Sequence, residues 1–107
     1  MTTGNPPLAA ERDGARLRLQ PQVNLVASTV EHQRSAMAQA LKNPAGEVVL
    51  DLAQVEQLDS LGITLVLGLF KSCQKEGTPF RLEGVRPDLM RVFRLFNLAK
   101  FFPIREA

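Results

Sequence analysis

Two aspartates and a serine are the side chains of this sequence whose types and spacing could support chemistry. Asp51 lies in an apolar run, and Asp59 and Ser60 stand together just before a second, longer apolar run. Two carboxylates could form an acid pair or hold magnesium, whereas a serine could act as a nucleophile. A serine at the start of a helix could instead accept a phosphate group, because free N–H groups and the helix dipole favour an anion there.

The residues around these side chains argue against an enzyme. Aspartates that flank a loop usually accept hydrogen bonds from the turn backbone, so Asp51 is expected to support its loop. The nucleophilic-aspartate pattern of phosphotransferases needs a second aspartate where this sequence has Ala53. Ser60 has no glycine two residues before it, and His32 is the only histidine that could serve as a base. Local physics leaves two interpretations of Ser60, a helix-capping serine and a phosphorylated serine, and favours the first.

The residues on either side of Ser60 predict a strand, a loop and a helix. Residues 48–52, VVLDL, are almost entirely apolar, which favours a strand buried on both faces. Residues 54–57 are polar enough to form the turn. The apolar run 61–70 is too long for a strand, and the basic residues and Gly77 that follow it are typical of a helix end. The helix is expected to begin at or beside Ser60, with the Ser60 hydroxyl as its cap.

The amino-terminal part of the sequence predicts a leader and a hairpin. Residues 1–7 contain Gly4, Pro6 and Pro7 and are expected to form a loose leader. Residues 8–11 predict an edge strand, and residues 15–19, ARLRL, alternate as a second strand does. Asp13-Gly14 between them is a hairpin turn signal.

Helix and strand signals alternate in the rest of the chain. Ser28 and Glu31 have the spacing of a capping box, which predicts a helix that ends at Asn43-Pro44. Residues 79–84 predict a strand, and Pro87 suits the first position of a helix that Asn97 ends. The apolar stripe of that helix is expected to consist of Leu89, Val92, Phe93 and Phe96. A last short strand is expected at Phe101, Phe102 and Ile104.

Composition limits the function classes. A chain of 107 residues has the size of one domain, and we expect residues 1–107 to form a single domain. The sequence has no apolar run of membrane-spanning length and no secretory signal pattern, which predicts a cytoplasmic protein without membrane insertion. A formal charge of +2 is too small to indicate nucleic-acid binding. Cys73 is the only cysteine and is expected in the core, and His32 is expected at the surface, so no metal site or other cofactor is predicted.

These elements predict an α/β fold with the order β-β-α-β-α-β-α-β. Helices between strands require parallel crossovers, whereas the opening hairpin adds an antiparallel strand. The result is a mixed, mostly parallel β-sheet covered by α-helices. Because open sheets of this kind hold their sites at the carboxyl ends of the strands, residues 53–59 and the start of the next helix form the predicted functional rim.

The sequence from Asp51 to Gly77, DLAQVEQLDSLGITLVLGLFKSCQKEG, resembles the signature of the STAS domain. It is most similar to bacterial anti-sigma-factor antagonists, in which a strand ends in Asp and Asp-Ser-x-Gly opens a helix, here Asp59, Ser60 and Gly62. The resemblance extends over nearly the whole chain, because RLEGVRPDLMRVFRLFNLAKFF resembles the closing strand, helix and final strand of the family. The chain departs from the family's Gly-Glu-Leu-Asp segment, where it has Pro21, Gln22 and Asn24.

The resemblance implies a function as a regulator. In that family the serine is phosphorylated by a small serine kinase that is also the anti-sigma factor, and a serine phosphatase reverses the reaction. It implies that Ser60 is the switch residue, that phosphorylation releases the partner, and that the protein is a monomer or weak homodimer. The residues expected to bind the partner are Asn24, Asp59, Leu61, Gly62, Ile63 and Thr64.

An alternative function has the same fold. STAS accessory subunits of lipid ABC transporters dock on the transporter ATPase, and they often carry threonine at the position of Ser60. The helix that contains VRPDLMRVFRLFNL is compatible with either function.

Overall fold

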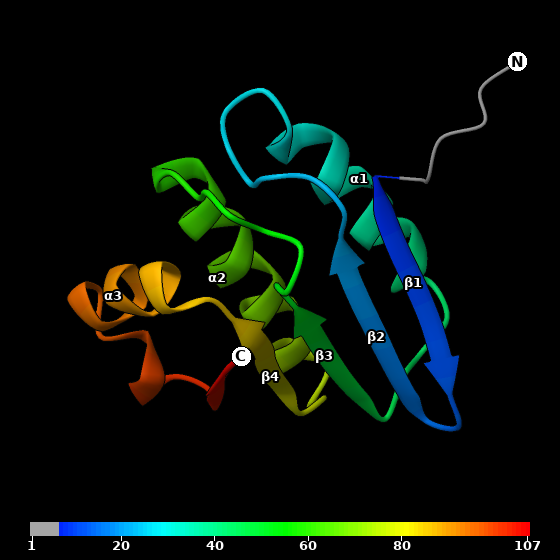
Figure 1. Ribbon diagram of the computed structural model, residues 1–107. Helices are drawn as coiled ribbons and strands as arrows, with labels where there is room; N and C mark the ends of the chain where they lie inside the picture. The colour runs from blue at the N-terminus through cyan, green and yellow to red at the C-terminus, as the bar shows by residue number, and fades with distance from the viewer. Residues whose placement is uncertain (1–6) are drawn as a thin grey trace, which may run out of the picture.

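The computed structural model describes residues 7–107 and contains five strands, three α-helices and one short 3₁₀-helix in that range (Figure 1). In chain order these are β1 (Leu8–Asp13), β2 (Arg16–Pro21), α1 (Val30–Ala40), β3 (Glu47–Asp51), α2 (Ser60–Lys75), β4 (Phe80–Val85), α3 (Pro87–Leu95), the 3₁₀-helix η1 (Leu98–Lys100) and β5 (Ile104–Glu106). The predicted order of strands and helices is confirmed, with η1 as an addition. None of the helices within residues 7–107 is both long and apolar enough to cross a membrane.

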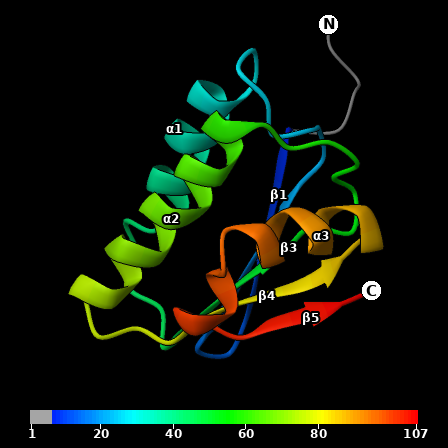
Figure 2. The same ribbon diagram turned by 90° about the vertical axis from the view of Figure 1, so that its left-hand side faces the viewer.

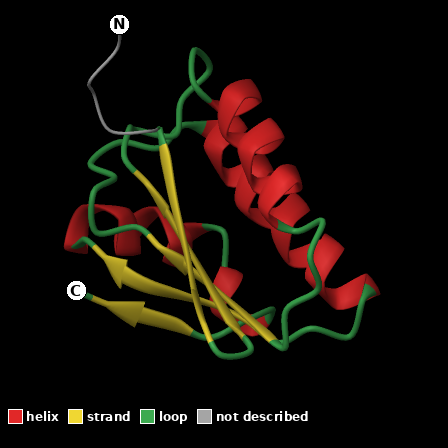
Figure 3. Ribbon diagram, turned by 90° about the vertical axis from the view of Figure 1, so that its right-hand side faces the viewer, coloured by secondary structure: helices red, strands yellow, loops and turns green. Residues whose placement is uncertain are grey.

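The strands form one mixed sheet in the spatial order β1-β2-β3-β4-β5. β1 pairs antiparallel with β2, and every later pair is parallel. Each parallel connection leads to the adjacent strand, always toward the β5 edge of the sheet. Right-handed crossovers that all advance in one direction place their helices on the same face of the sheet. In Figure 2, α3 lies in front of β3 and β4 and α1 and α2 lie to the left of the strands, and in Figure 3, from the opposite side, no helix of the described chain lies in front of the strands. The helices therefore cover one face of the sheet, and not both.

The buried core lies between this sheet face and the helices. Alternate strand residues point into it and are nearly inaccessible, among them Leu17, Leu19, Leu50 and Leu82. The aromatic end of the core is formed by Phe70, Phe80 and Phe102, with ring centroids 5.2 Å apart for the pairs 70–102 and 80–102.

The opposite face of the sheet carries a lattice of ion pairs. Arg18 contacts Asp51 at 2.8 Å and Glu83 at 3.1 Å, and Arg81 contacts Glu83 at 2.7 Å. Glu47 joins the lattice through Arg81 and, at 3.0 Å, through Arg16. Val49 on β3 has 0% exposure although it lies outside the hydrophobic core cluster. The charged side chains thus cover β3 on this face, and the predicted burial of β3 on both faces is confirmed without a second layer of helices.

Several predicted boundaries need correction. The leader was expected to include Pro7, but the Pro7 carbonyl accepts hydrogen bonds from the Gln22 N–H at 2.8 Å and from Gln33 Nε2 at 2.7 Å. The rest of the expected leader lies outside the described residues. The hairpin turn is confirmed, since Gly14 adopts φ 62° between β1 and β2. The last strand begins at Ile104, later than predicted.

The predicted capping box of α1 does not form. Thr29 occupies the N-cap position, and its side chain makes no cap hydrogen bond: the hydroxyl accepts from the Val26 N–H at 3.0 Å and donates to the Asn24 carbonyl at 2.5 Å, both in the preceding loop. Glu31 pairs with Arg34. The prediction that Phe96 belongs to the buried stripe of α3 is also wrong, because its exposure is 54%.

Candidate functional site

The candidate site is built where two loops meet beyond the carboxyl ends of β2 and β3. Residues 22–29 lead into α1 and residues 52–59 lead into α2. An isolated parallel bridge joins Leu25 to Leu58. The Leu25 N–H donates to the Gln57 carbonyl at 3.1 Å, and the Asp59 N–H donates to the Leu25 carbonyl at 3.2 Å. The two loops are therefore held as one short extension of the sheet.

The side chain of Asn24 also links the two loops. Its Oδ1 accepts hydrogen bonds from the backbone N–H groups of Glu56 at 2.8 Å and Gln57 at 3.1 Å. Asn24 was expected to bind a partner, and the structure shows a contact to the neighbouring loop. A side-chain amide oxygen that satisfies two backbone donors fixes the loop in place.

Asp59 caps helix α2 and ties it to the loop before α1. Oδ1 accepts from the N–H groups of Leu61 and Gly62, each at 3.0 Å, and Oδ2 accepts from the Ala27 N–H at 2.9 Å. These donors, that of Gly62 foremost, hold the pKa of the Asp59 carboxyl below its ordinary value against the opposing effect of burial. Asp59 is therefore a structural carboxylate with its oxygens committed to backbone donors.

Ser60 is the first residue of α2 and is exposed. The expectation that its hydroxyl caps the helix is wrong, because Asp59 occupies the N-cap position and supplies the cap. The side chain of Ser60 thus lies at the amino end of α2 but is not required to cap the helix.

Gly62 allows α2 to pack closely against the two loops. A methyl group at this position would overlap the Leu25 carbonyl oxygen and would lie 2.9 Å from Leu58 Cγ. Gly62 is buried, and so is Ile63 with 5% exposure. These two residues were expected to bind a partner, but as folded they have little or no surface to offer one.

Leu61 and Thr64 do reach the surface beside Ser60. Leu61 is 47% exposed. Thr64 is exposed, and its hydroxyl donates to the Ser60 carbonyl at 3.0 Å, one turn earlier in α2. Ser60, Leu61 and Thr64 therefore form the accessible part of the predicted rim, and we call them the α2 start surface.

Asp51 holds the end of β3 through both of its carboxylate oxygens. Oδ1 accepts from the Ala53 N–H at 2.9 Å, and Oδ2 accepts from Arg18 at 2.8 Å and from Gln20 at 2.9 Å. Gly84 on the next strand has φ 68°, and a methyl group there would lie 2.7 Å from Asp51 Oδ1. The sequence does not mark Arg18, Gln20 and Gly84 as partners of Asp51, because the three come together only in the folded sheet.

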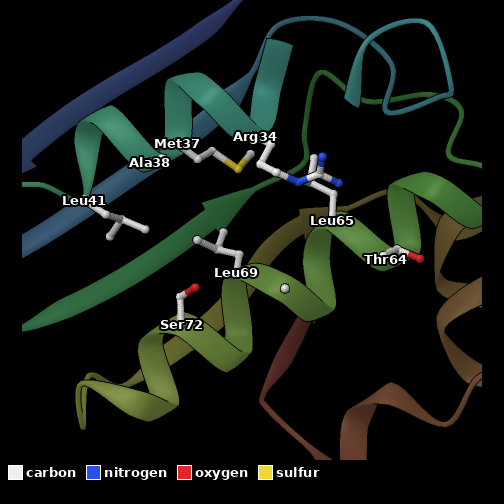
Figure 4. Close-up of a pocket in the computed structure, with 9 residues that line it drawn as sticks. Arg34, Met37, Ala38, Leu41, Thr64, Leu65, Leu69 and Ser72 are labelled. Carbon is white, nitrogen blue, oxygen red and sulfur yellow. The ribbon is translucent and has the colours of Figure 1, made fainter. Parts of the chain in front are cut away.

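A groove between α1 and α2 begins next to this surface (Figure 4). It has a volume of about 310 Å³, and Met37, Leu41, Leu65 and Leu69 contribute apolar walls while Arg34 and Thr64 lie at its edge. Gly68 leaves open space on the α2 side, because a methyl group there would have no neighbour within 4 Å. The lining includes neither a carboxylate nor a histidine, so the groove has the character of a packing surface.

Comparison with known proteins identifies the family. The STAS domain model matches residues 7–107. A candidate anti-sigma factor antagonist of Thermotoga maritima has a similar fold, with a TM-score of 0.86 and 21% identity over 94% of this chain and 86% of that chain. An anti-sigma factor antagonist of Mycobacterium paratuberculosis gives a TM-score of 0.83 and 21% identity, over 94% and 85% of the two chains. The anti-sigma factor antagonist SpoIIAA in its unphosphorylated form gives a TM-score of 0.69 and 19% identity, over 94% and 87%.

The match of the domain model covers nearly the whole chain, and the mixed five-stranded sheet with its helices agrees with these structures. The chain therefore belongs to the STAS domain family.

Proposed function

We propose that this protein is an anti-sigma factor antagonist that acts through a phosphorylation-controlled partner switch. In this proposal the unmodified protein binds an anti-sigma factor that is also a serine kinase. Phosphorylation of Ser60 releases that partner, and a serine phosphatase restores binding. Membership of the STAS family and the three similar structures support the general role.

One observation carries the choice of Ser60. Its side chain is exposed at the first position of α2, while Asp59 supplies the helix cap. A serine that capped the helix would lose a stabilising hydrogen bond on modification. Since Ser60 does not cap α2, a kinase could modify its hydroxyl without removing a capping hydrogen bond.

The same geometry suggests how a phosphate would act. A phosphoserine carries about −1.5 to −2 charges at pH 7. The N–H groups of Leu61 and Gly62 already donate to Asp59, so the phosphate would stay at the surface and gain mainly the general attraction of a helix amino end. A partner that buries Leu61 would also have to bury this dianion beside the Asp59 carboxylate, which is unfavourable unless the partner supplies compensating cations.

The proposal assigns two kinds of residue to the switch. The α2 start surface, Ser60, Leu61 and Thr64, contacts the partner. Asn24, Asp59, Gly62 and Ile63 hold this surface in place through the contacts described above.

A phosphotransfer experiment tests the proposal. The purified protein is incubated with ATP and a candidate cognate anti-sigma factor kinase, and the modified residue is identified by mass spectrometry. We expect a single phosphate on Ser60 and none on Ser60→Ala. Ser28→Ala, which changes another exposed serine in the adjacent loop, is expected to be phosphorylated like the wild type. Transfer to a residue other than Ser60 would contradict the proposal.

A further inference from the structure

A second exposed apolar surface lies at the carboxyl end of α3 and in the turn that follows. Leu95 is 83% exposed, Phe96 is 54% exposed and Phe101 is 46% exposed. We call these three residues the α3 end patch. Apolar side chains of this size gathered on one exposed segment indicate an interaction site, whereas a single exposed leucine would need no explanation.

The α3 end patch is held on a fixed frame. Leu98 of η1 and Phe102 are buried, with exposures of 2% and 3%, and Asn97 turns the chain between α3 and η1 with φ 53°. The ring of Phe101 lies 6.0 Å from that of Phe70 on α2, measured between centroids. The three exposed side chains therefore project from an anchored turn.

Basic residues accompany this patch in the sequence. The segment 87–101 contains Arg91, Arg94 and Lys100 and one acidic residue, Asp88, which pairs with Arg91 at 3.7 Å. The Lys100 ammonium lies 5.1 Å from the centre of the Phe101 ring. Arg94 lies 3.7 Å from Glu106, and both side chains are exposed, at 68% and 44%. Arg91, Arg94 and Lys100 set against Asp88 and Glu106 leave one positive charge in excess, that of Lys100 beside the Phe101 ring. The surface thus combines protruding apolar groups with a positive charge, and it complements a partner that is both apolar and anionic.

We propose that the α3 end patch docks this protein on the surface of an anionic lipid bilayer. Leu95, Phe96 and Phe101 would enter the boundary between headgroups and acyl chains, and the neighbouring cations would contact lipid phosphates. A bilayer accepts protruding side chains without a shaped cavity. Two copies of this chain joined through the patch would instead bring their basic rims together, which disfavours a homodimer there. The binding is peripheral and needs no spanning helix.

The patch lies away from the Ser60 rim. α3 (Pro87–Leu95) begins directly after the carboxyl end of β4 and runs back along the sheet, so its carboxyl end lies toward the opposite end of the strands (Figure 2). Ser60 lies at the carboxyl ends of the strands. A bilayer and a protein partner could therefore be bound at the same time, and the inference does not depend on the phosphorylation of Ser60.

Vesicle cosedimentation tests the inference with the full chain. Vesicles that contain equal parts of phosphatidylcholine and phosphatidylglycerol are compared with vesicles of phosphatidylcholine alone. We expect binding to the anionic vesicles that weakens with added salt, since surface attraction between charges is screened. The double variant Leu95→Ser, Phe96→Ser is expected to bind at least about tenfold more weakly, because most of the inserted apolar area is lost.

A charge variant and a matched control complete the test. Lys100→Glu is expected to weaken binding by about fivefold or more, since one cation near an anionic surface contributes about that factor. Leu61→Ser, which changes an exposed leucine on the α2 start surface, is expected to bind vesicles like the wild type. Circular dichroism checks that each variant is folded.

Three outcomes would overturn the inference. One is a folded wild type that does not sediment with anionic vesicles. Another is a double variant that binds them as tightly as the wild type. The third is concentration-dependent self-association that the double variant abolishes while vesicle binding is absent, which would assign the patch to a homodimer.

Discussion

Gly62 packs directly against the backbone of Leu25, so that a methyl group on Gly62 would overlap the Leu25 carbonyl oxygen. That carbonyl also accepts the Asp59 N–H that leads into α2. The start of α2 and the bridge between the two loops therefore depend on the absence of a side chain at this position.

Gly62→Ala is expected to lower the free energy of unfolding by about 1–3 kcal/mol, the usual cost of forcing an extra methyl group into a packed site. The backbone carbonyl cannot move without breaking the loop bridge, which is why the site cannot relax easily. Gly68→Ala is the matched control in the same helix, because its methyl group would meet nothing within 4 Å. That control should stabilise the protein by up to about 1 kcal/mol through helix propensity. Urea unfolding of both variants checks this contrast, and equal changes would contradict it.

Asp59 has two structural tasks that two substitutions can separate. Asp59→Ala removes the cap of α2 and the link to Ala27, and it is expected to lower the melting temperature more than Asp59→Asn does. Asparagine keeps one oxygen for the Leu61 and Gly62 N–H groups but loses the charge and the second acceptor. Thermal unfolding followed by circular dichroism measures the order. A variant with asparagine that melts as low as the alanine variant would show that the link to Ala27 matters more than the cap.

The ion pairs on the open face of the sheet predict a loss of stability in acid. The Arg81 side chain lowers the pKa of the Glu83 carboxyl by hydrogen bonding, against the opposing effect of burial, and Arg18 lowers it further. Because the folded pKa lies below the unfolded one, this stabilisation is present above the ordinary value of 4.5 and is lost as the pH falls through the folded pKa. Urea unfolding at neutral pH and at a series of acidic pH values checks the sign.

Glu83→Gln should reduce this pH dependence, because the variant has no proton to bind at that position. Glu56→Gln is a suitable comparison, since Glu56 is exposed and forms no ion pair among the described residues. If both variants keep the wild-type pH dependence of the free energy of unfolding, Glu83 does not contribute to it.

Leu61 separates partner binding from folding. Leu61→Asp is expected to weaken binding of the cognate kinase by at least about tenfold, because it places a charge in an apolar contact. Its effect on the melting temperature should be small, since Leu61 is 47% exposed. Leu95→Asp places the same charge on an exposed leucine of the α3 end patch and should leave kinase binding unchanged. Isothermal titration calorimetry with the kinase compares the three proteins, and equal affinity for all of them would exclude the α2 start surface as the contact.

The order of the elements could be predicted from the sequence because its signals are local. The Asp13-Gly14 turn, Pro87 at the first position of α3 and Asn97 after it act on neighbouring residues, and the structure confirms all three. The predicted cap of α1 by Ser28 and Glu31 failed because the N-cap is Thr29, one residue later, and the hydroxyl of Thr29 contacts the preceding loop. The burial of Phe96 was also predicted wrongly, since α3 ends at Leu95 before the apolar stripe is complete.

The site was only partly predictable for the same reason. Asp59, Ser60 and Gly62 are close in sequence, and their spacing marks the start of a helix. That Asp59 is the residue held in the capping position, which leaves Ser60 free of that role, depends on the Ala27 N–H, which a different loop provides. Likewise, Arg18 and Gln20 contact Asp51 only because β2 pairs with β3, and no local sequence pattern predicts such a contact.

The decisive prediction concerns Ser60 itself. Phosphorylated protein is expected to bind the cognate kinase at least about tenfold more weakly than unmodified protein, because a buried dianion without compensating cations is unfavourable. Its melting temperature should change little, since the phosphate gains some attraction from the helix amino end and the cap at Asp59 is untouched. Ser60→Ala should bind like the unmodified protein but accept no phosphate, whereas Ser60→Asp should imitate the modified state only in part, because its charge is smaller and its side chain shorter. Calorimetry and thermal unfolding on samples verified by mass spectrometry measure both quantities. Equal affinity of the phosphorylated and unmodified proteins would reduce Ser60 to an exposed residue of α2 without a switching role.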